Sequence, residues 1–281
     1  MILNIKRILT IAGSDPSGGA GIQADIKTIT CMGAYAMSAI TAITIQNTNG
    51  VSDIQAVATN IISKQIDAVI NDIGVDAVKT GMLVNREIVE VVAEKLITKD
   101  IKTIVIDPVM QAKDGTALLC NEGIDALREC LIPIATVITP NIPEAIMLTG
   151  IEIKNIKTMK IAAEKLYKLG CKNVVIKGGH STGTRAIDVL FDGDKFYEFS
   201  VIKIHTKNTH GTGCTFSSAL SVALALGKNI NQAVNDAKEF VNIAIEHSLC
   251  LGTGHGPTNH LAPLLNSVFK SMNDEANKAK D

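Results

Sequence analysis

A thiol stands where a glycine-rich loop turns into a helix in the stretch NTHGTGCTFSSAL, residues 208–220. Apolar residues at helical spacing after the glycines predict a helix that begins at Cys214. The first N–H groups of a helix have no partner within the helix, and the helix dipole adds positive potential around them. This turn is therefore a candidate anion hole suited to a phosphate. The anion loop is defined by four residues: Gly211, Thr212, Gly213 and Cys214.

The Cys214 thiol has two interpretations that the residues alone leave open. The helix terminus is expected to lower the pKa of the thiol, and a thiolate could accept a proton from an alcohol nucleophile. Alternatively, Cys214 is a small packing residue that contributes only its backbone N–H to the anion hole. Covalent attack would need a dedicated base, and the sequence places none beside the thiol. Neither the GxxxxGK[ST] motif nor a GxGxxG motif after the first strand occurs in the chain.

Strand-like apolar segments alternate with helical segments along the chain, which predicts an α/β fold with a mostly parallel sheet and helices on both faces. The predicted strands include 7–12, 38–45 and a hairpin of 186–191 with 195–199, and the predicted helices include 22–32, one capped by Asn60, 86–97, 122–130, 142–148, 159–169 and 231–248. Ligands of such sheets bind beyond the carboxyl ends of the strands. Seven polar or glycine-rich segments follow strands and are expected to build one extended site: GSDPSGG, QNTNG, KTGM, DPVM, TPNIPE, KGGH and THGTGC.

The composition fits such a domain and excludes several other classes of protein. The chain has 281 residues, of which 46% are hydrophobic and 3% aromatic, so an aliphatic core is expected. A formal charge of −1 argues against a nucleic-acid groove or a membrane surface, and no apolar run is long enough to cross a bilayer. The six cysteines form no CxxC and are expected to be reduced, buried small residues, with the exception of Cys214. A cytoplasmic protein without a secretory signal is expected.

Seven blocks of the chain, in order, resemble the pattern of hydroxymethylpyrimidine/phosphomethylpyrimidine kinases, which belong to the ribokinase-like superfamily. The blocks are AGSDPSGGAGIQADIKT, QNTNGV, KTGML, DPVM, ITPNIPEA, KGGH and NTHGTGCT. The resemblance runs from about Arg7 to His260. It implies two phosphoryl transfers from ATP in thiamine biosynthesis, first to 4-amino-5-hydroxymethyl-2-methylpyrimidine and then to its monophosphate. It also implies a ribokinase-like kinase domain without a separate lid domain, here residues 1–270, and a homodimer; the polar stretch 271–281 is expected to be a tail.

The resemblance also implies which residues hold the pyrimidine. Gly13, Asp25 and Gln46 correspond to groups that bind it, and a carboxylate and a carboxamide suit the donors and acceptors of an aminopyrimidine edge. Met82 and Val109 match apolar positions that would sandwich the ring.

For the nucleotide, the resemblance implies that Lys177 contacts the phosphates of ATP. Asn141 and Glu144 match a motif near Mg²⁺ and phosphate, with Glu144 reaching the metal through water. The anion loop would hold the transferred group, and Cys214 stands where most ribokinase-like sugar kinases have an aspartate base. His180 and His210 lie in the same loops and are expected to be hydrogen-bonding residues.

Two alternatives to this kinase remain. A pyridoxal kinase of the same thiol-bearing subgroup would share the GSD segment and the anion loop, whereas the carboxamide in QNT favours an aminopyrimidine. A non-catalytic nucleotide sensor would lack the phosphate and metal groups that Lys177, Asn141 and Glu144 supply.

Overall fold

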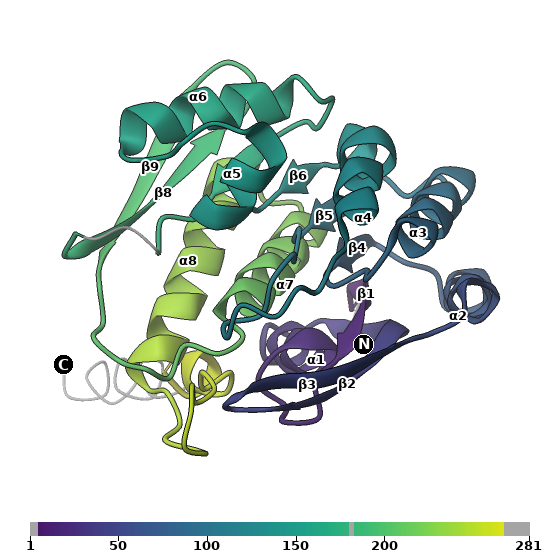
Figure 1. Cartoon of the computed structure of the whole chain (residues 1–281), viewed down its shortest axis with the longest axis horizontal. Helices are drawn as coiled ribbons and strands as arrows, with labels where there is room; N and C mark the ends of the chain where they lie inside the picture. Colours follow the sequence, from purple (N-terminus) through teal and green to yellow (C-terminus); the bar gives the residue numbers. More distant parts are fainter. Residues whose placement is uncertain (1–4, 180–182, 267–281) are drawn as a thin grey trace, which may run out of the picture.

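The computed structural model describes residues 5–179 and 183–266 (Figure 1). His180 and the predicted tail 271–281 lie outside the described residues. The strands are β1 (Arg7–Ser14), β2 (Tyr35–Asn47), β3 (Gly50–Ala56), β4 (Ala77–Thr80), β5 (Ile104–Ile106), β6 (Val137–Ile138), β7 (Val174–Ile176), β8 (Arg185–Phe191) and β9 (Phe196–Ile202).

These strands form one sheet in the order β3-β2-β1-β4-β5-β6-β7-β8-β9. The six central strands, from β2 to β7 in that order, pair in parallel. Antiparallel strands close both edges: β3 pairs with β2, and the β8–β9 hairpin pairs with β7. The predicted α/β class, the mostly parallel sheet and the edge hairpin are therefore confirmed.

Helices cover both faces of the sheet, as the alternation of segments predicts (Figure 1). On one face lie α1 (Gly21–Cys31), α7 (Thr212–Ala225) and α8 (Ile230–Glu246). On the other lie α2 (Thr59–Asp72), α3 (Arg86–Thr98), α4 (Asn121–Ala126), α5 (Ile142–Thr149) and α6 (Ile156–Tyr167). Among the described helices, none is long and apolar enough to span a membrane.

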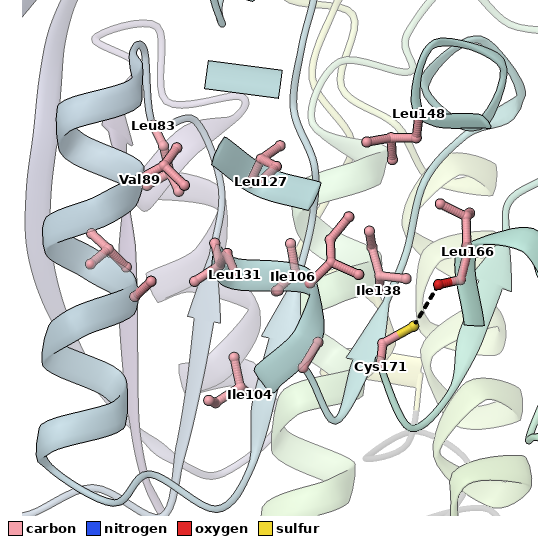
Figure 2. Close-up of a cluster of buried hydrophobic side chains, with 14 of the residues drawn as sticks. Leu83, Val89, Ile104, Ile106, Leu127, Leu131, Ile138, Leu148, Leu166 and Cys171 are labelled. Carbon is pink, nitrogen blue, oxygen red and sulfur yellow. Dashed lines mark hydrogen bonds between the residues drawn. The ribbon is translucent and has the colours of Figure 1, made fainter. Parts of the chain in front are cut away.

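The core between the sheet and the second group of helices is aliphatic (Figure 2). Ile104 and Ile106 of β5 pack with Leu131, which follows α4, and all three side chains are at most 2% exposed. At the end of this layer the thiol of Cys171 donates to the carbonyl oxygen of Leu166 (3.5 Å). Desolvation raises the pKa of the Cys171 thiol to about 12, which fits an unreactive packing residue.

Some local predictions are wrong, each for an identifiable reason. Strand β3 was not predicted because none of its residues is buried and its few apolar side chains do not alternate with polar ones. The helix 122–130 ends early: α4 passes into a π-helical turn at Leu127–Leu131, after which Pro133 enters a 3₁₀ turn. Asn60 lies inside α2 instead of capping it. Cys120 and Cys250 are exposed and do not fit the expectation of burial.

Candidate active site

A cavity of about 570 Å³ lies beyond the carboxyl ends of the parallel strands. Each of the seven sequence segments expected to build one site contributes to its wall. The lining includes Gly13, Gln46, Met82, Asp107, Val109, Asn141, Glu144, Lys177 and Gly179, together with His210 and all four residues of the anion loop. By sheet order, Gln46 on β2 and the β8–β9 hairpin stand at opposite ends of this cavity.

The anion loop delivers the N-terminus of α7 to the cavity. Helix α7 begins at Thr212, two residues before the predicted start, with Gly211 at the N-cap position and φ of 83°. A Cβ on Gly211 would lie 1.8 Å from the carbonyl oxygen of Gly19, so only glycine fits this close approach. Within the described part of the chain, the N–H groups of Gly213 and Cys214 have no hydrogen-bond acceptor. They are therefore free to bind an anion.

A cation stands directly against this loop. Lys177 Nζ donates to Asp107 Oδ1 at 2.8 Å, and a Cβ on Gly213 would lie only 3.3 Å from that ammonium. Although desolvation alone would lower the pKa of Lys177, the charges of Asp107 and Glu144 raise it, so the ammonium stays protonated. Asp107 follows strand β5 in DPVM and was missed as a site residue. The signal for it was available, since it is an aspartate directly after a buried strand.

Asn141 and Glu144 form the N-terminal cap of α5 as well as part of the cavity wall. Asn141 Oδ1 accepts from the N–H of Glu144 (2.9 Å), and Glu144 Oε2 accepts from the N–H of Asn141 (2.8 Å). Such a reciprocal capping box explains the spacing of NIPE in structural terms. Desolvation and the nearby charge of Asp107 raise the pKa of Glu144 to about 7, against the opposing effect of Lys177. Two carboxylates so close to each other favour a shared cation, and oxygen ligands of this kind suit Mg²⁺.

Four of the five residues expected to hold the pyrimidine lie on the cavity wall. The side chain of Met82 lies against Gly13. A Cβ placed on Gly13 would be only 3.0 Å from the Met82 sulfur. Gln46 accepts a hydrogen bond from Thr44 Oγ1 (3.1 Å), and its amide nitrogen lies 3.4 Å from His210 Nε2. Because the amide nitrogen carries two hydrogens, it keeps a donor for a ligand. Val109 completes an apolar wall beside this carboxamide.

Asp25 is the exception, and its expected contact with the pyrimidine is not possible in this structure. Its side chain is 0% exposed and lies off the cavity. Both carboxylate oxygens accept from Lys79 Nζ at 2.9 Å, and they also accept from Thr10 Oγ1 (2.6 Å) and Ser218 Oγ (2.7 Å). Helix α7 covers this network, which the sequence could not reveal because its members come from four distant segments.

The expected lowering of the Cys214 pKa is also wrong. Desolvation raises the pKa of the thiol to about 12, and this outweighs the opposing effects of Lys79 and of the Gly21 N–H. A thiol with such a pKa is protonated at neutral pH and is no proton acceptor in the ligand-free site. The raised pKa and the free backbone N–H of Cys214 therefore favour the interpretation in which this residue contributes its N–H to the anion hole.

A histidine ties the first glycine-rich loop to the anion loop. His210 Nε2 donates to Asp15 Oδ2 (2.8 Å), and the amide nitrogen of Gln46 lies 3.4 Å from the same ring nitrogen. Although desolvation acts in the opposite direction, hydrogen bonds from His210, Ser17 and Ala20 lower the pKa of Asp15 to about 2. His210 is thus a hydrogen-bonding residue, and Asp15 was missed although it lies in GSDPSGG.

The end of the cavity beside the β8–β9 hairpin is formed by residues that no sequence motif identifies. Four apolar side chains line it: Ala186, Val201, Val241 and Ile245. Lys238 Nζ donates to Asp188 Oδ2 (2.7 Å), and the other carboxylate oxygen accepts from the N–H of Gly178 (2.8 Å). These residues belong to the hairpin and to α8, where no motif marks them.

Comparison with known proteins relates most of the chain to one family. The sequence model described as phosphomethylpyrimidine kinase matches residues 15–259. The hydroxymethylpyrimidine/phosphomethylpyrimidine kinase of Bacillus subtilis is 49% identical over 270 residues, which cover 96% of this chain and 100% of that relative. The thiamine biosynthesis bifunctional protein ThiED of Geobacter sulfurreducens is 48% identical over 90% of this chain, and the chain spans only 52% of that relative's length.

Solved structures show the same fold. Bacillus subtilis pyridoxal kinase, in an ADP complex, is 43% identical with a TM-score of 0.87, covering 93% of this chain and 100% of that chain. Phosphomethylpyrimidine kinase from Clostridium difficile is 47% identical with a TM-score of 0.77, and the match covers 85% of this chain and 99% of that chain. The ribokinase-like α/β fold expected from the sequence is therefore confirmed, although relatives with this fold carry two different substrate names.

Proposed function

The chain belongs to the phosphomethylpyrimidine kinase family and is a phosphotransferase, and from that premise we propose that it phosphorylates 4-amino-5-hydroxymethyl-2-methylpyrimidine and then its monophosphate. ATP is the proposed donor, and thiamine biosynthesis the proposed context. One observation carries the proposal: a single cavity joins the anion loop and Lys177 to the wall formed by Gln46, Met82 and Val109.

The anion loop and Lys177 would act on the transferred phosphoryl group. The bond between the γ-phosphorus and its bridging oxygen breaks and ADP leaves, while the acceptor oxygen bonds to the γ-phosphorus through a loose transition state. The proton of the first acceptor's hydroxyl group passes to a phosphate oxygen or to water. Positioning and charge stabilisation then supply most of the acceleration, so donors fixed by the fold matter more than a strong base. The free N–H groups of Gly213 and Cys214 and the ammonium of Lys177 are donors of this kind.

Mg²⁺ would be held by carboxylate oxygens of Asp107 and Glu144 together with phosphate oxygens, and when bound it would neutralise the charge that develops on the phosphates. At the hairpin end, the apolar residues Ala186, Val201 and Val241 offer a surface for the adenine ring of ATP. At the other end, Gln46 can donate from its amide nitrogen to a ring nitrogen of the pyrimidine.

A coupled ADP-release assay on the purified protein, with each candidate acceptor in turn, tests the proposal. We expect substrate-dependent turnover with the hydroxymethylpyrimidine and with its monophosphate. Pyridoxal is the second candidate, because a relative of this fold is a pyridoxal kinase. Equal kcat/KM values for pyridoxal and the hydroxymethylpyrimidine would contradict the preference assigned to Gln46, and no turnover with any acceptor would favour a nucleotide sensor.

A cytoplasmic homodimer is the proposed setting of this enzyme. Tyr35, Ile43 and Ile45 on β2 are at least half exposed, and such side chains near a sheet edge suit contact with a second copy. Analytical ultracentrifugation of the wild-type protein tests the dimer, and a monomer at micromolar concentration would contradict it.

A further inference from the structure

Three lysines line the cavity in the described part of the chain, and they differ in how their charge is balanced. Lys177 pairs with Asp107 and Lys238 pairs with Asp188, both at less than 3 Å. Lys113 has no such ion pair among the described residues. Its ammonium instead donates to the hydroxyl of Thr209, two residues before the anion loop.

Lys113 lies at the acceptor end of the cavity. The loop that carries it follows Val109, and it also lines a small hollow that Gln46 and His210 share. Lys113 thus shares a hollow with the carboxamide proposed to hold the pyrimidine, and its ammonium contacts Thr209, close in sequence to the loop proposed to hold the transferred group. The adenine surface of the hairpin lies toward the other edge of the sheet.

Asp114, the carboxylate next to Lys113 along the chain, lines the same hollow but is not its ion-pair partner among the described residues. Its oxygens accept from the N–H groups of Val51 and Thr116, each at 3.0 Å. Desolvation lowers the pKa of Lys113 to about 8, so the ammonium is still mostly protonated at neutral pH and an added anion would stabilise it further.

An unbalanced cation is not needed to bind the hydroxymethylpyrimidine, which is uncharged, but it is suited to a phosphomonoester. We propose that Lys113 binds the phosphate of the pyrimidine monophosphate and so selects that acceptor for the second phosphoryl transfer. This inference rests on the proposed function, because it assigns a residue to one of its two acceptors. The first acceptor would then bind through Gln46 and the apolar wall without help from Lys113.

Steady-state kinetics on Lys113→Met with the two acceptors tests this assignment, because methionine keeps the length of the side chain and removes the charge. Loss of a charge-assisted hydrogen bond predicts that KM for the monophosphate rises about tenfold or more. KM for the hydroxymethylpyrimidine and KM for ATP should stay within about twofold, since neither contact involves Lys113 in this proposal. Lys113→Arg should recover part of the monophosphate affinity.

The matched control is Lys207→Met, which removes an exposed lysine that donates to the carbonyl of Thr253 outside the cavity wall. It should leave all three KM values unchanged. Equal increases for both acceptors, or an increase for ATP alone, would overturn the assignment by showing a general or nucleotide role. Unchanged kinetics would overturn it too. If the wild-type protein phosphorylates neither pyrimidine, the proposed function itself fails, which is a separate result.

Discussion

Two lysine–aspartate pairs near the anion loop share one chemistry and differ in their surroundings. Lys79 on β4 and Asp25 on α1 are both 0% exposed and sealed under α7. Lys177 and Asp107, which follow β7 and β5, are 14% and 2% exposed and line the cavity. Cys214 interacts electrostatically with both lysines, so the thiol lies between the two pairs.

The difference lies in access. In the sealed pair, every oxygen of Asp25 accepts from Lys79, Thr10 or Ser218, and no ligand can reach the carboxylate. In the open pair, Lys177 keeps donor capacity toward the cavity. An ion pair next to a phosphate site can therefore bind a ligand only where the fold leaves the pair open to the cavity. A sealed pair instead holds together the helices and strands that carry the site. Variants of the two pairs separate these roles.

The largest effect is expected when the sealed pair is broken. Lys79→Met leaves Asp25 charged and uncompensated in the core, so the free energy of unfolding should fall by about 3–5 kcal/mol. Lys79→Met/Asp25→Asn should recover most of this loss, since no charge then remains unpaired. Urea denaturation followed by circular dichroism measures both, with Lys102→Met, from an exposed pair, as the control. A single variant as stable as the wild type would contradict the structural role.

Breaking the open pair should affect catalysis more than stability. Lys177→Met removes a donor aimed at the transferred phosphoryl group, and kcat/KM should fall roughly 10²–10³-fold. Because Asp107 faces the cavity, where water and Mg²⁺ can compensate its charge, the loss of stability should be smaller than for Lys79→Met. ADP-release kinetics and the same urea titration test this, and a variant that unfolds as easily as Lys79→Met would remove the contrast between the pairs.

A pH effect should appear at the open pair alone, through its neighbour Glu144. The pKa of Glu144 is raised from 4.5 to about 7 in the folded protein, so the folded state binds the proton more tightly than the unfolded state. The contribution of Glu144 to stability is therefore fully present below about pH 4.5 and is lost as the pH rises to about 7, by no more than about 3 kcal/mol.

Glu144→Gln should remove this dependence, because glutamine keeps the capping acceptor and does not titrate. The free energy of unfolding of the wild type minus that of the variant, measured from pH 4.5 to 7, isolates the effect of Glu144 from groups such as His260 that titrate equally in both proteins. A flat difference curve would show that Glu144 is not perturbed.

The smallest effect is expected at the residue between the pairs. Cys214→Ala keeps the backbone N–H groups of the anion loop and removes a thiol that is protonated at neutral pH. We expect kcat to fall less than about tenfold, because general-base catalysis, which supplies roughly 10²–10⁴-fold, would not be lost. Single-turnover kinetics with saturating ATP provides the measurement. A loss within that larger range would restore the proton-acceptor interpretation.

The sequence predicted the frame of the fold well where the physical signal was strong. The buried strand β1 is a largely apolar run and β2 is rich in β-branched residues, so both strands were predicted. Glycines after apolar helices marked the ends of α5 and α6. Strand β3 could not be predicted from the sequence, because an exposed edge strand needs no alternation of apolar and polar residues. The π-helical turn after α4 has no signal in the sequence before Pro133.

The sequence by itself determined which residue types the candidate site contains. These are glycines where a helix must begin, a lysine and carboxylates after strands, and a carboxamide after another strand. These follow from local rules, because strand ends and helix starts leave unpaired polar groups that few residue types can satisfy. The tertiary structure decided the rest, because burial and pairing depend on contacts between distant segments. The packing of α7 over β1 and β4 seals Asp25 away, and burial raises the pKa of Cys214. Among the described residues, Lys113 lines the cavity without an ion-pair partner, which follows from the placement of distant segments as well.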